Sequence, residues 1–427
     1  MRKKFTDLVC ISILLIVGSI LSLDNLHALD VVFEDHQYSF QLLRTMGYSC
    51  TGGADIAECL STAYRIEESN NESWHKEWVE TAERLEKTAD KFLDEGHTAS
   101  AREAYFRSSN YYRNAGFFLV TDPKDPRIIK TYQKSRECFQ KGARFSEHPI
   151  EFVRIPFEGT TLPGYLLLVD NSQKERPLLI IHSGFDGTAE ELYFEIGALA
   201  VDRGYNCLLF EGPGQGCVIR EQKIPFRPNW ETVVTPVVDF ALELPEVDPE
   251  RIGLIGISFG GYFAPRAVAF EHRIKVCVAN GGIYDFYENM IRKFPPDTEK
   301  ILDDHDACVQ FDKESKEIMK QNVDIEFFFA NGMYTFGTES PSELIRMLKP
   351  YNMREAAKLI RCKMLVVDSE GDNDLPGQAG ELYEALECPK EFMLFTEKES
   401  AEEHCQMGAI MISGERILNW LDENLMK

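Results

Sequence analysis

The chain has 427 residues, of which 44% are hydrophobic, and 46 Lys and Arg oppose 70 Asp and Glu, a formal net charge of −24. This composition is typical of a globular protein with a large core and excludes a disordered chain. The excess of acidic groups argues against nucleic acid or an anionic membrane surface as the main partner, because phosphate binding needs cations.

The first 28 residues differ from the rest of the chain. Residues 2–4 are basic, residues 8–23 carry no charge, and Ala28 is a small residue at a suitable cleavage point. This order is typical of a secretory signal, and the apolar run is shorter than a spanning helix of about 20 residues. We expect a cleaved signal peptide (1–28) and a secreted or periplasmic protein without stable membrane insertion. The alternative is an uncleaved N-terminal segment that anchors the protein to a membrane.

Ten of the 11 cysteines follow this segment, and an exported protein can pair some of them. Cys50 and Cys59 lie close together in a polar stretch that contains glycine, which favours a disulfide between them. Cys207, Cys277 and Cys362 lie in apolar runs typical of strands, where a free cysteine packs as a small hydrophobic residue. No Cys-x-x-Cys pair occurs, so a structural zinc site of that kind is not expected.

Helical periodicity dominates residues 29–147. From Trp74 onward, apolar residues recur at steps of three and four, which predicts a helix with one buried face. Ser100 and Glu103 form a capping-box pattern at the start of a second helix, and a third follows at about 127–143. A tetratricopeptide-like array needs at least three stacked repeats. We therefore expect an N-terminal helical cap domain on a catalytic domain.

The catalytic domain is expected over residues 148–427, where short β-rich runs alternate with helical segments. This alternation predicts an α/β fold with a doubly wound, mostly parallel sheet. The first two runs have no helix between them, which predicts an antiparallel hairpin at one edge. The predicted strands cover residues 151–157, 164–169, 178–182, 206–210, 252–257, 275–279, 364–368 and 391–395.

The alternation stops between residues 281 and 361, which we interpret as an inserted lid rich in Phe and Tyr. In α/β sheets, ligands bind at the carboxyl ends of the strands, so a lid and a helical cap there should enclose the site. We expect Phe328 and Tyr334 of this segment to contact the substrate. The other aromatic residues nearby are expected to pack the lid onto its neighbours.

Residues 256–260 read G-I-S-F-G and match the pattern G-x-S-x-G around Ser258. An apolar run typical of a buried strand precedes the motif, and Gly260, Gly261 and Ala264 open a helix after it. A nucleophile elbow requires this order of strand, sharp turn and helix, and its glycines let neighbouring chains approach closely. The motif predicts Ser258 as a nucleophile rather than as part of a structural Gly-Ser turn.

A serine hydroxyl needs a base that takes its proton. In hydrolases with such an elbow, the acid and then the histidine follow the serine along the chain. Of the nine histidines, only His404 follows the late strand 364–368. The chain order therefore selects His404 as the base.

The acid comes from a cluster at the end of that strand, formed by Asp368, Glu370, Asp372 and Asp374. Asp368 is still within the strand, whereas Asp372 lies in the following turn, from which a carboxylate reaches His404. We choose Asp372, with Asp374 as the second choice. The cluster fails the pattern of an EF-hand calcium loop, which requires Gly at the sixth position and Glu at the twelfth.

Residues 182–186 read H-S-G-F-D at the end of a strand. Hydrolases of this kind place a backbone N–H here, opposite the N–H of the residue after the nucleophile. Together the two groups hold the oxyanion that forms during the reaction. We assign the N–H groups of Phe185 and Phe259 to this role.

Two further motifs are set aside. Residues 211–216 read E-G-P-G-Q-G, which lacks the G-x-G-x-x-G spacing of a dinucleotide-binding loop. The Asp, His and Cys residues within 303–308 are more typical of a solvated charge run than of a metal site. We expect neither a metal nor a cofactor.

Several of these stretches resemble the FrsA-like α/β-hydrolases, a family that includes 2,6-dihydroxypseudooxynicotine hydrolase-like and fungal polyketide-shortening hydrolases. The resemblance implies Ser258, Asp372 and His404 as the triad. It also implies an acidic residue near the oxyanion strand in members that cleave carbon–carbon bonds, and Asp186, Glu190 and Glu191 all remain candidates. The resembling stretches are residues 101–113, 184–191, 211–216, 256–261, 368–378 and 401–406.

We therefore expect a serine hydrolase that acts through an acyl-enzyme on a small ester or carbonyl compound, with carbon–carbon cleavage included. One alternative is a peptidase of the acylaminoacyl- or dipeptidyl-peptidase kind. Another, of a different class, is an inactive binding protein on a hydrolase scaffold. The sequence leaves a homodimer open.

Overall fold

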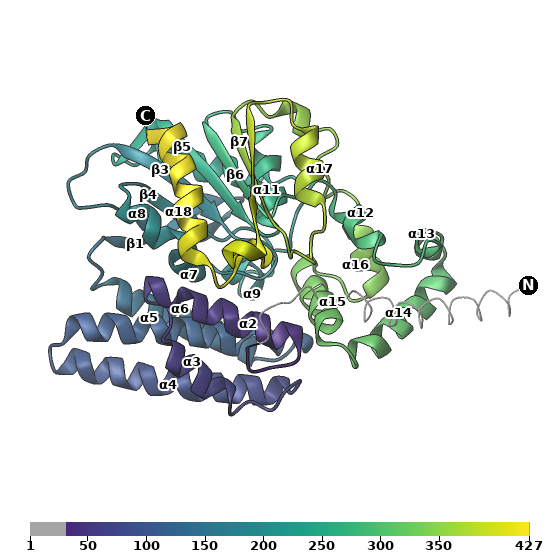
Figure 1. Ribbon diagram of the computed structural model, residues 1–427, viewed down its shortest axis with the longest axis horizontal. Helices are drawn as coiled ribbons and strands as arrows, with labels where there is room; N and C mark the ends of the chain where they lie inside the picture. Colours follow the sequence, from purple (N-terminus) through teal and green to yellow (C-terminus); the bar gives the residue numbers. More distant parts are fainter. Residues whose placement is uncertain (1–30, 427) are drawn as a thin grey trace, which may run out of the picture.

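The computed structural model describes residues 31–426. The expected signal peptide, residues 1–28, lies outside the described residues. Among those residues, no helix combines the length and the apolar composition needed to cross a membrane. Figure 1 shows a central sheet flanked by helices, a layer of N-terminal helices against one end of it, and a further group of helices beside that layer.

Eight strands form one sheet in the order β1-β2-β4-β3-β5-β6-β7-β8. β2 is antiparallel to both of its neighbours, and all other neighbours are parallel. The mostly parallel α/β fold and its edge hairpin are thus confirmed. The strands are β1 (Ile150–Phe157), β2 (Thr160–Leu167), β3 (Arg176–His182), β4 (Asn206–Phe210), β5 (Val247–Ile257), β6 (Val276–Asn280), β7 (Lys363–Ser369) and β8 (Lys390–Phe395).

β2 begins four residues earlier than the sequence predicts, at Thr160. Glu158 and Gly159 both have positive φ angles, 42° and 82°. A two-residue turn of this kind matches the twist of a hairpin, so pairing with β1 starts directly after it, at Phe157 and Thr160.

The central parallel strands, β3 to β7, are largely buried on both faces, and successive residues alternate between two hydrophobic clusters. Ile180 and Leu254 join one cluster with α10, α11 and α17, whereas Ile181 and Ile255 join the other with α8 and α18. This double burial explains why the strands read as continuous apolar runs. The helices of this domain are α7 (Ala189–Leu192), α8 (Ala198–Asp202), α9 (Gly216–Arg220), α10 (Glu231–Leu242), α11 (Gly260–Val268), α17 (Gln378–Ala385) and α18 (Ile410–Leu421).

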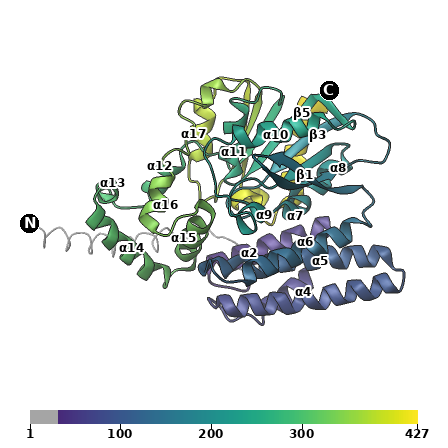
Figure 2. The same ribbon diagram turned by 180° about the vertical axis from the view of Figure 1, so that it is seen from behind.

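The N-terminal layer lies across the end of the sheet where α7 and α9 lie, as both views show (Figures 1 and 2). Its centre is aromatic: the rings of Tyr38 and Phe118 stack at 4.8 Å, and Trp74 meets both edge-on. α6 has the predicted bounds, whereas α2 and α3 were not expected. The helices are α2 (His36–Gly47), α3 (Ile56–Ala63), α4 (Asn71–Asp94), α5 (Thr98–Ala115) and α6 (Arg127–Ala143), with a short 3-10 helix η2 (Phe117–Thr121).

The predicted capping box at Ser100 and Glu103 is wrong. α5 begins at Thr98, and its N-cap is His97, whose side chain makes no capping hydrogen bond. Gly96 adopts a left-handed conformation, φ 82°, directly after α4. The chain therefore reverses within three residues, and the next helix starts before it reaches the capping pattern.

The predicted disulfide is also wrong, because Cys50 and Cys59 are both free thiols. Cys59 faces the interior, where its Sγ lies 3.6 Å from the Tyr111 hydroxyl, while Cys50 is exposed. α3, which the sequence analysis did not predict, carries Cys59 into the aromatic core and away from Cys50.

The segment 281–361 consists mainly of helices joined by turns and loops, and it contacts the N-terminal layer. Side chains of Asp285, Asp304, Asn322 and Ser340 cap four of its helices. The ring of Phe327 stacks on Phe117 of η2 at 4.3 Å, which joins the two layers. The helices are α12 (Phe286–Ile291), α13 (Thr298–Leu302), α14 (His305–Met319), α15 (Val323–Phe336) and α16 (Pro341–Met347).

Candidate active site

Ser258 occupies a strained turn between β5 and α11. Its φ angle is 61°, in the left-handed region that non-glycine residues rarely adopt. The turn is tight, because a Cβ added to Gly256 would lie 2.1 Å from the Gly260 carbonyl oxygen, and one added to Gly261 would lie 2.0 Å from that of Gly281. The backbone N–H of Ser258 donates to the Asn280 carbonyl at 2.8 Å and fixes the turn to β6.

The three residues of the expected triad meet at the carboxyl end of the sheet. His404 Nε2 lies 2.9 Å from Ser258 Oγ, and His404 Nδ1 lies 2.6 Å from Asp372 Oδ2. The backbone N–H groups of Asp374 and Leu375 each donate to Asp372 Oδ1 at 3.0 Å. Asp372 is buried, whereas the second choice, Asp374, has an exposed side chain.

Asp372 and His404 are desolvated, and each favours the charged form of the other. Burial disfavours the charged form of Asp372, but His404 and the hydrogen bonds outweigh it and hold the pKa of this carboxyl below its usual range. Burial also disfavours the charged form of His404, yet Asp372 raises the pKa of the imidazole well above its usual value. Asp372 thus favours the protonated form of His404, which is the form that arises when the imidazole takes a proton.

Three potential metal ligands also meet here: Asp372, Asp374 and His404 present donor atoms within 4.8 Å of one another. Both oxygens of Asp372 already accept hydrogen bonds, and His404 contacts Asp372 and Ser258. A cation at this place would have to compete with those contacts.

The loop after β3 is held close to the elbow. Gln215 Nε2 donates to the carbonyls of Ser183 and Gly184 at 2.6 and 3.2 Å, and Asn331 Nδ2 of α15 donates to the Phe185 carbonyl at 3.0 Å. Gly184 passes so close to the elbow that an added Cβ would lie 2.3 Å from the Phe259 nitrogen. Within residues 31–426, neither Phe185 N–H nor the N–H of that elbow residue has a hydrogen-bond partner.

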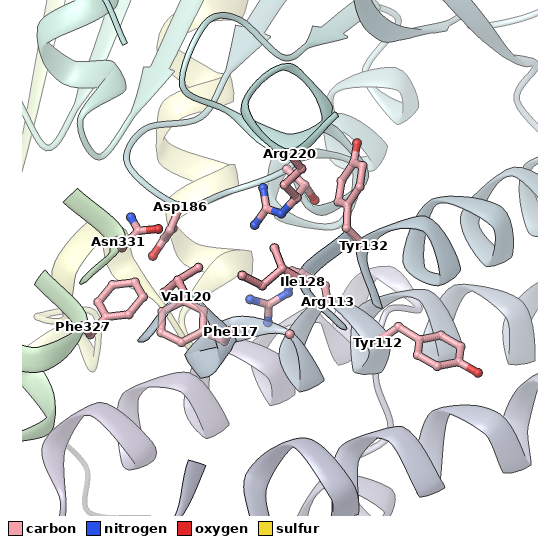
Figure 3. Close-up of a pocket in the computed structure, with 12 residues that line it drawn as sticks. Tyr112, Arg113, Phe117, Val120, Ile128, Tyr132, Asp186, Arg220, Phe327 and Asn331 are labelled. Atoms are coloured by element: carbon pink, nitrogen blue, oxygen red, sulfur yellow. The ribbon is translucent and has the colours of Figure 1, made fainter. Parts of the chain in front are cut away.

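A cavity that is partly open to solvent lies next to this loop, between the N-terminal layer and α15 (Figure 3). Asn331, which holds the Phe185 carbonyl, also lines it. The lining residues are Tyr112, Arg113, Gly116, Phe117, Val120, Ile128, Tyr132, Asp186, Thr188, Arg220, Phe327 and Asn331.

Of the three acidic candidates near the oxyanion strand, only Asp186 lines this cavity. Glu191 is buried under the N-terminal layer, where Arg44 binds both of its oxygens at 2.7 Å. Glu190 accepts a hydrogen bond from the Tyr165 hydroxyl at 2.7 Å. Burial, with the charge of the neighbouring Glu211, raises the pKa of Glu190 to about 7. Glu190 and Glu191 thus have partners inside the protein and stand outside the cavity lining.

The two lid residues expected to contact the substrate lie on α15 and are half-buried. The Phe328 ring stacks on that of Phe185, in the loop after β3, with the ring centres 6.0 Å apart. Tyr334 lies under the Lys223 ammonium group, which is 5.6 Å from its ring centre. Neither residue lines the cavity of Figure 3.

No sequence pattern had indicated that arginines belong to this region. Arg44 comes from the unexpected α2, Arg113 from α5, and Arg220 from the end of α9. A signal for α2 was present, because Asp35 is a capping residue and Tyr38 and Leu42 are spaced four apart. Nothing local to Arg113 or Arg220 predicts that the two guanidinium groups meet one cavity.

A mostly parallel sheet with a serine at a sharp strand–helix turn defines the α/β-hydrolase class. Residues 59–295 match the FrsA-like family, described as esterase FrsA-like. The chain belongs to this family of hydrolases, which confirms the resemblance seen in the sequence.

Curated relatives cover almost the whole chain. The hydrolase acrC of Aspergillus aculeatus is 32% identical over 417 residues, 90% of this chain and 96% of that protein. The 20-hydroxy-prefusarin hydrolase FUS2 of Gibberella moniliformis is 30% identical, over 92% of this chain and 97% of its own. The crystal structure of 2,6-dihydroxy-pseudo-oxynicotine hydrolase has a TM-score of 0.69 at 21% identity and covers 89% of this chain and 95% of that one, which shows a shared fold.

Proposed function

We propose that the protein is a serine hydrolase that cleaves a small ester or carbonyl compound through an acyl-enzyme. The observation that carries this proposal is the continuous hydrogen-bonded chain from Ser258 Oγ through His404 to Asp372. The backbone N–H groups of Phe185 and Phe259, which have no hydrogen-bond partner within the described part of the chain, are suited to hold the oxyanion that acyl transfer requires.

In the first half of the reaction, Ser258 Oγ attacks the substrate carbonyl while His404 Nε2 takes its proton. Asp372 accepts a hydrogen bond from His404 Nδ1–H, so Nε2 is the nitrogen with a free electron pair. Negative charge develops on the carbonyl oxygen, and the N–H groups of Phe185 and Phe259 stabilise it. His404 then gives the proton to the leaving group, and an ester with Ser258 remains.

In the second half, water replaces the leaving group. His404 takes a proton from the water, the resulting hydroxide attacks the acyl carbonyl, and the same two N–H groups hold the oxyanion. Collapse of this intermediate returns the proton to Ser258 Oγ and releases an acid. If the leaving group is a stabilised carbanion rather than an alkoxide, the same steps cleave a carbon–carbon bond.

A small substrate is supported by the layers that surround the site. The N-terminal helices and α15 meet at the Phe117–Phe327 stack and leave a cavity rather than an open groove. Such a site favours a compact apolar molecule over an extended peptide. The relative FUS2 is named as a 20-hydroxy-prefusarin hydrolase, an enzyme that acts on a small molecule.

The test combines labelling with a substrate panel. A fluorophosphonate should label the full chain and fail to label Ser258→Ala, which separates an enzyme from an inactive binding scaffold. With 4-nitrophenyl acyl esters, an aryl β-diketone and peptide anilides, we expect a higher kcat/KM for an ester or the diketone than for any anilide. A tenfold advantage of an anilide would favour the peptidase alternative, and absence of labelling would reject the serine mechanism.

A further inference from the structure

The cavity beside the oxyanion loop holds two guanidinium groups that the mechanism above does not use. Figure 3 shows Arg113 reaching it from α5 and Arg220 from α9, on opposite walls. Neither residue was singled out by the sequence. The surroundings of the two guanidinium groups differ.

The charge of Arg113 is balanced inside the protein. Arg113 and Arg44 share the buried Glu191, at 3.4 and 2.7 Å, and Arg44 also pairs with Asp186 at 3.1 Å. Two arginines therefore face two carboxylates. Glu195, one helical turn further on, adds no full charge at neutral pH, because burial, with the charge of Glu191, raises its pKa to about 8.

The charge of Arg220 is not balanced in this way. Among residues 31–426 no carboxylate lies within salt-bridge distance of its guanidinium group, which donates to the Gly216 carbonyl at 3.2 Å and lies 5.2 Å from the Tyr132 ring centre. The neighbouring Glu221 pairs with Arg136 at 3.0 Å. Glu211 accepts hydrogen bonds from Tyr132 and from two backbone N–H groups.

The rest of the lining decides what kind of ligand such a cation would bind. Phe117, Val120, Ile128 and Phe327 form an apolar wall opposite Arg220. Cationic side chains in a partly desolvated pocket bind anions more strongly than exposed ones, because water competes less. The cavity thus fits a molecule with an apolar body and one anionic end.

We propose that this cavity binds a small acid, with the carboxylate of the ligand paired to Arg220 and its hydrocarbon part against Phe117 and Phe327. The proposal rests on the proposed function, for it makes the acid a part of the substrate. Asp186 of the lining directly follows Phe185 in the chain, and Asn331 joins the lining to the Phe185 carbonyl. A carboxylate held by Arg220 would therefore place a carbonyl further along the same molecule toward the oxyanion loop.

A binding experiment tests the cavity without turnover. In the full chain with Ser258→Ala, calorimetry compares 4-phenylbutyrate with the uncharged 4-phenylbutyramide, which has nearly the same shape. We expect the acid to bind about tenfold to a hundredfold more tightly, as for a charged hydrogen-bonded pair. Arg220→Gln should remove this preference, and Arg220→Lys should keep part of it, because lysine lacks the planar fork of arginine.

The matched control is Arg154→Gln, since Arg154 is an exposed arginine of β1 that, among the described residues, also has no salt bridge. It should leave the preference for the acid intact. Equal affinity of the acid and the amide, an unchanged preference in Arg220→Gln, or an equal loss in Arg154→Gln would overturn the proposal.

A kinetic experiment links the cavity to catalysis. In the unmodified protein, the 4-nitrophenyl monoester of glutaric acid should have a higher kcat/KM than the 4-nitrophenyl ester of valeric acid, and Arg220→Gln should reverse this order. Failure of the two proposals is distinguishable. Absence of fluorophosphonate labelling rejects the serine mechanism, whereas equal binding of acid and amide rejects the cavity, and either result can occur without the other.

Discussion

Two buried charge networks lie within the same molecule, and they are built differently. The first joins Ser258, His404 and Asp372, all from loops at the carboxyl ends of strands in one domain. The second joins Arg44 of the N-terminal layer to Glu191 of the catalytic domain, with side-chain exposures of 8% and 2%. The first network ends in a hydroxyl group at a strained turn, whereas each charge of the second has an opposite charge as partner.

We expect the first network to matter for catalytic turnover and the second for the stability of the fold. Removal of the Ser258 hydroxyl leaves no unpaired charge, so the fold should survive while turnover is lost. Removal of one member of the second network leaves a buried charge without a partner, which is costly.

Ser258→Ala should lower kcat by about 10⁶-fold, because the nucleophile is lost while the oxyanion groups remain. Thermal unfolding should be nearly unchanged. The measurements are steady-state hydrolysis of a 4-nitrophenyl ester and a melting curve. Activity close to that of the parent would contradict the assignment of Ser258.

Asp372→Asn should lower kcat by about 10⁴-fold, because His404 loses the partner that fixes its tautomer. Asp374→Asn is the matched control, since Asp374 is exposed and contributes its backbone N–H to Asp372. Its activity should stay within a few-fold of the parent. The reverse result would make Asp374 the acid of the triad.

Glu191→Gln should lower the free energy of unfolding by about 3–5 kcal/mol, as expected for a buried pair that loses one partner. Glu250→Gln breaks an exposed pair with Lys275 and should cost about 1 kcal/mol or less. Urea unfolding at neutral pH measures both. Equal effects would show that the interface between the two layers does not depend on this charge.

Glu195→Gln should change stability only at higher pH. Burial, with the charge of Glu191, raises the pKa of Glu195 to about 8 from 4.5. An acid with a raised folded pKa is fully compatible with folding below pH 4.5 and destabilises the fold progressively as pH rises toward 8. Between pH 5 and pH 8, the free energy of unfolding of the variant should therefore rise relative to that of the parent by at least ~1 kcal/mol, as measured by urea unfolding.

The control for this prediction is Glu175→Gln, since Glu175 is exposed. It should show no such gain. A gain of Glu195→Gln that is the same at pH 5 and at pH 8 would mean that ionisation of Glu195 is not its cause.

Local patterns predicted the parts of the fold that depend on neighbours in the chain. The central strands were placed because parallel strands buried on both faces read as apolar runs. The elbow around Ser258 was placed because glycines and a strand–helix junction lie within a few residues. Helices α2 and α3 were not predicted. The polar, glycine-containing stretch around Cys50 and Cys59 favoured a disulfide-linked loop, although Asp35 caps α2.

The sequence by itself determined the α/β class and predicted the order of serine, acid and histidine, since chain order and strand ends constrain both, but it left Asp372 and Asp374 as alternatives for the acid. Only the tertiary structure decided which carboxylates near the end of β3 are paired with an arginine. It also decided which arginine has no such pair. Arg44, about 140 residues earlier in the chain, pairs with Glu191 and Asp186, whereas Arg220 faces a cavity and has no carboxylate partner among residues 31–426. The physical reason is that charge balance depends on distances across domains, and spacing along a chain carries no record of those distances.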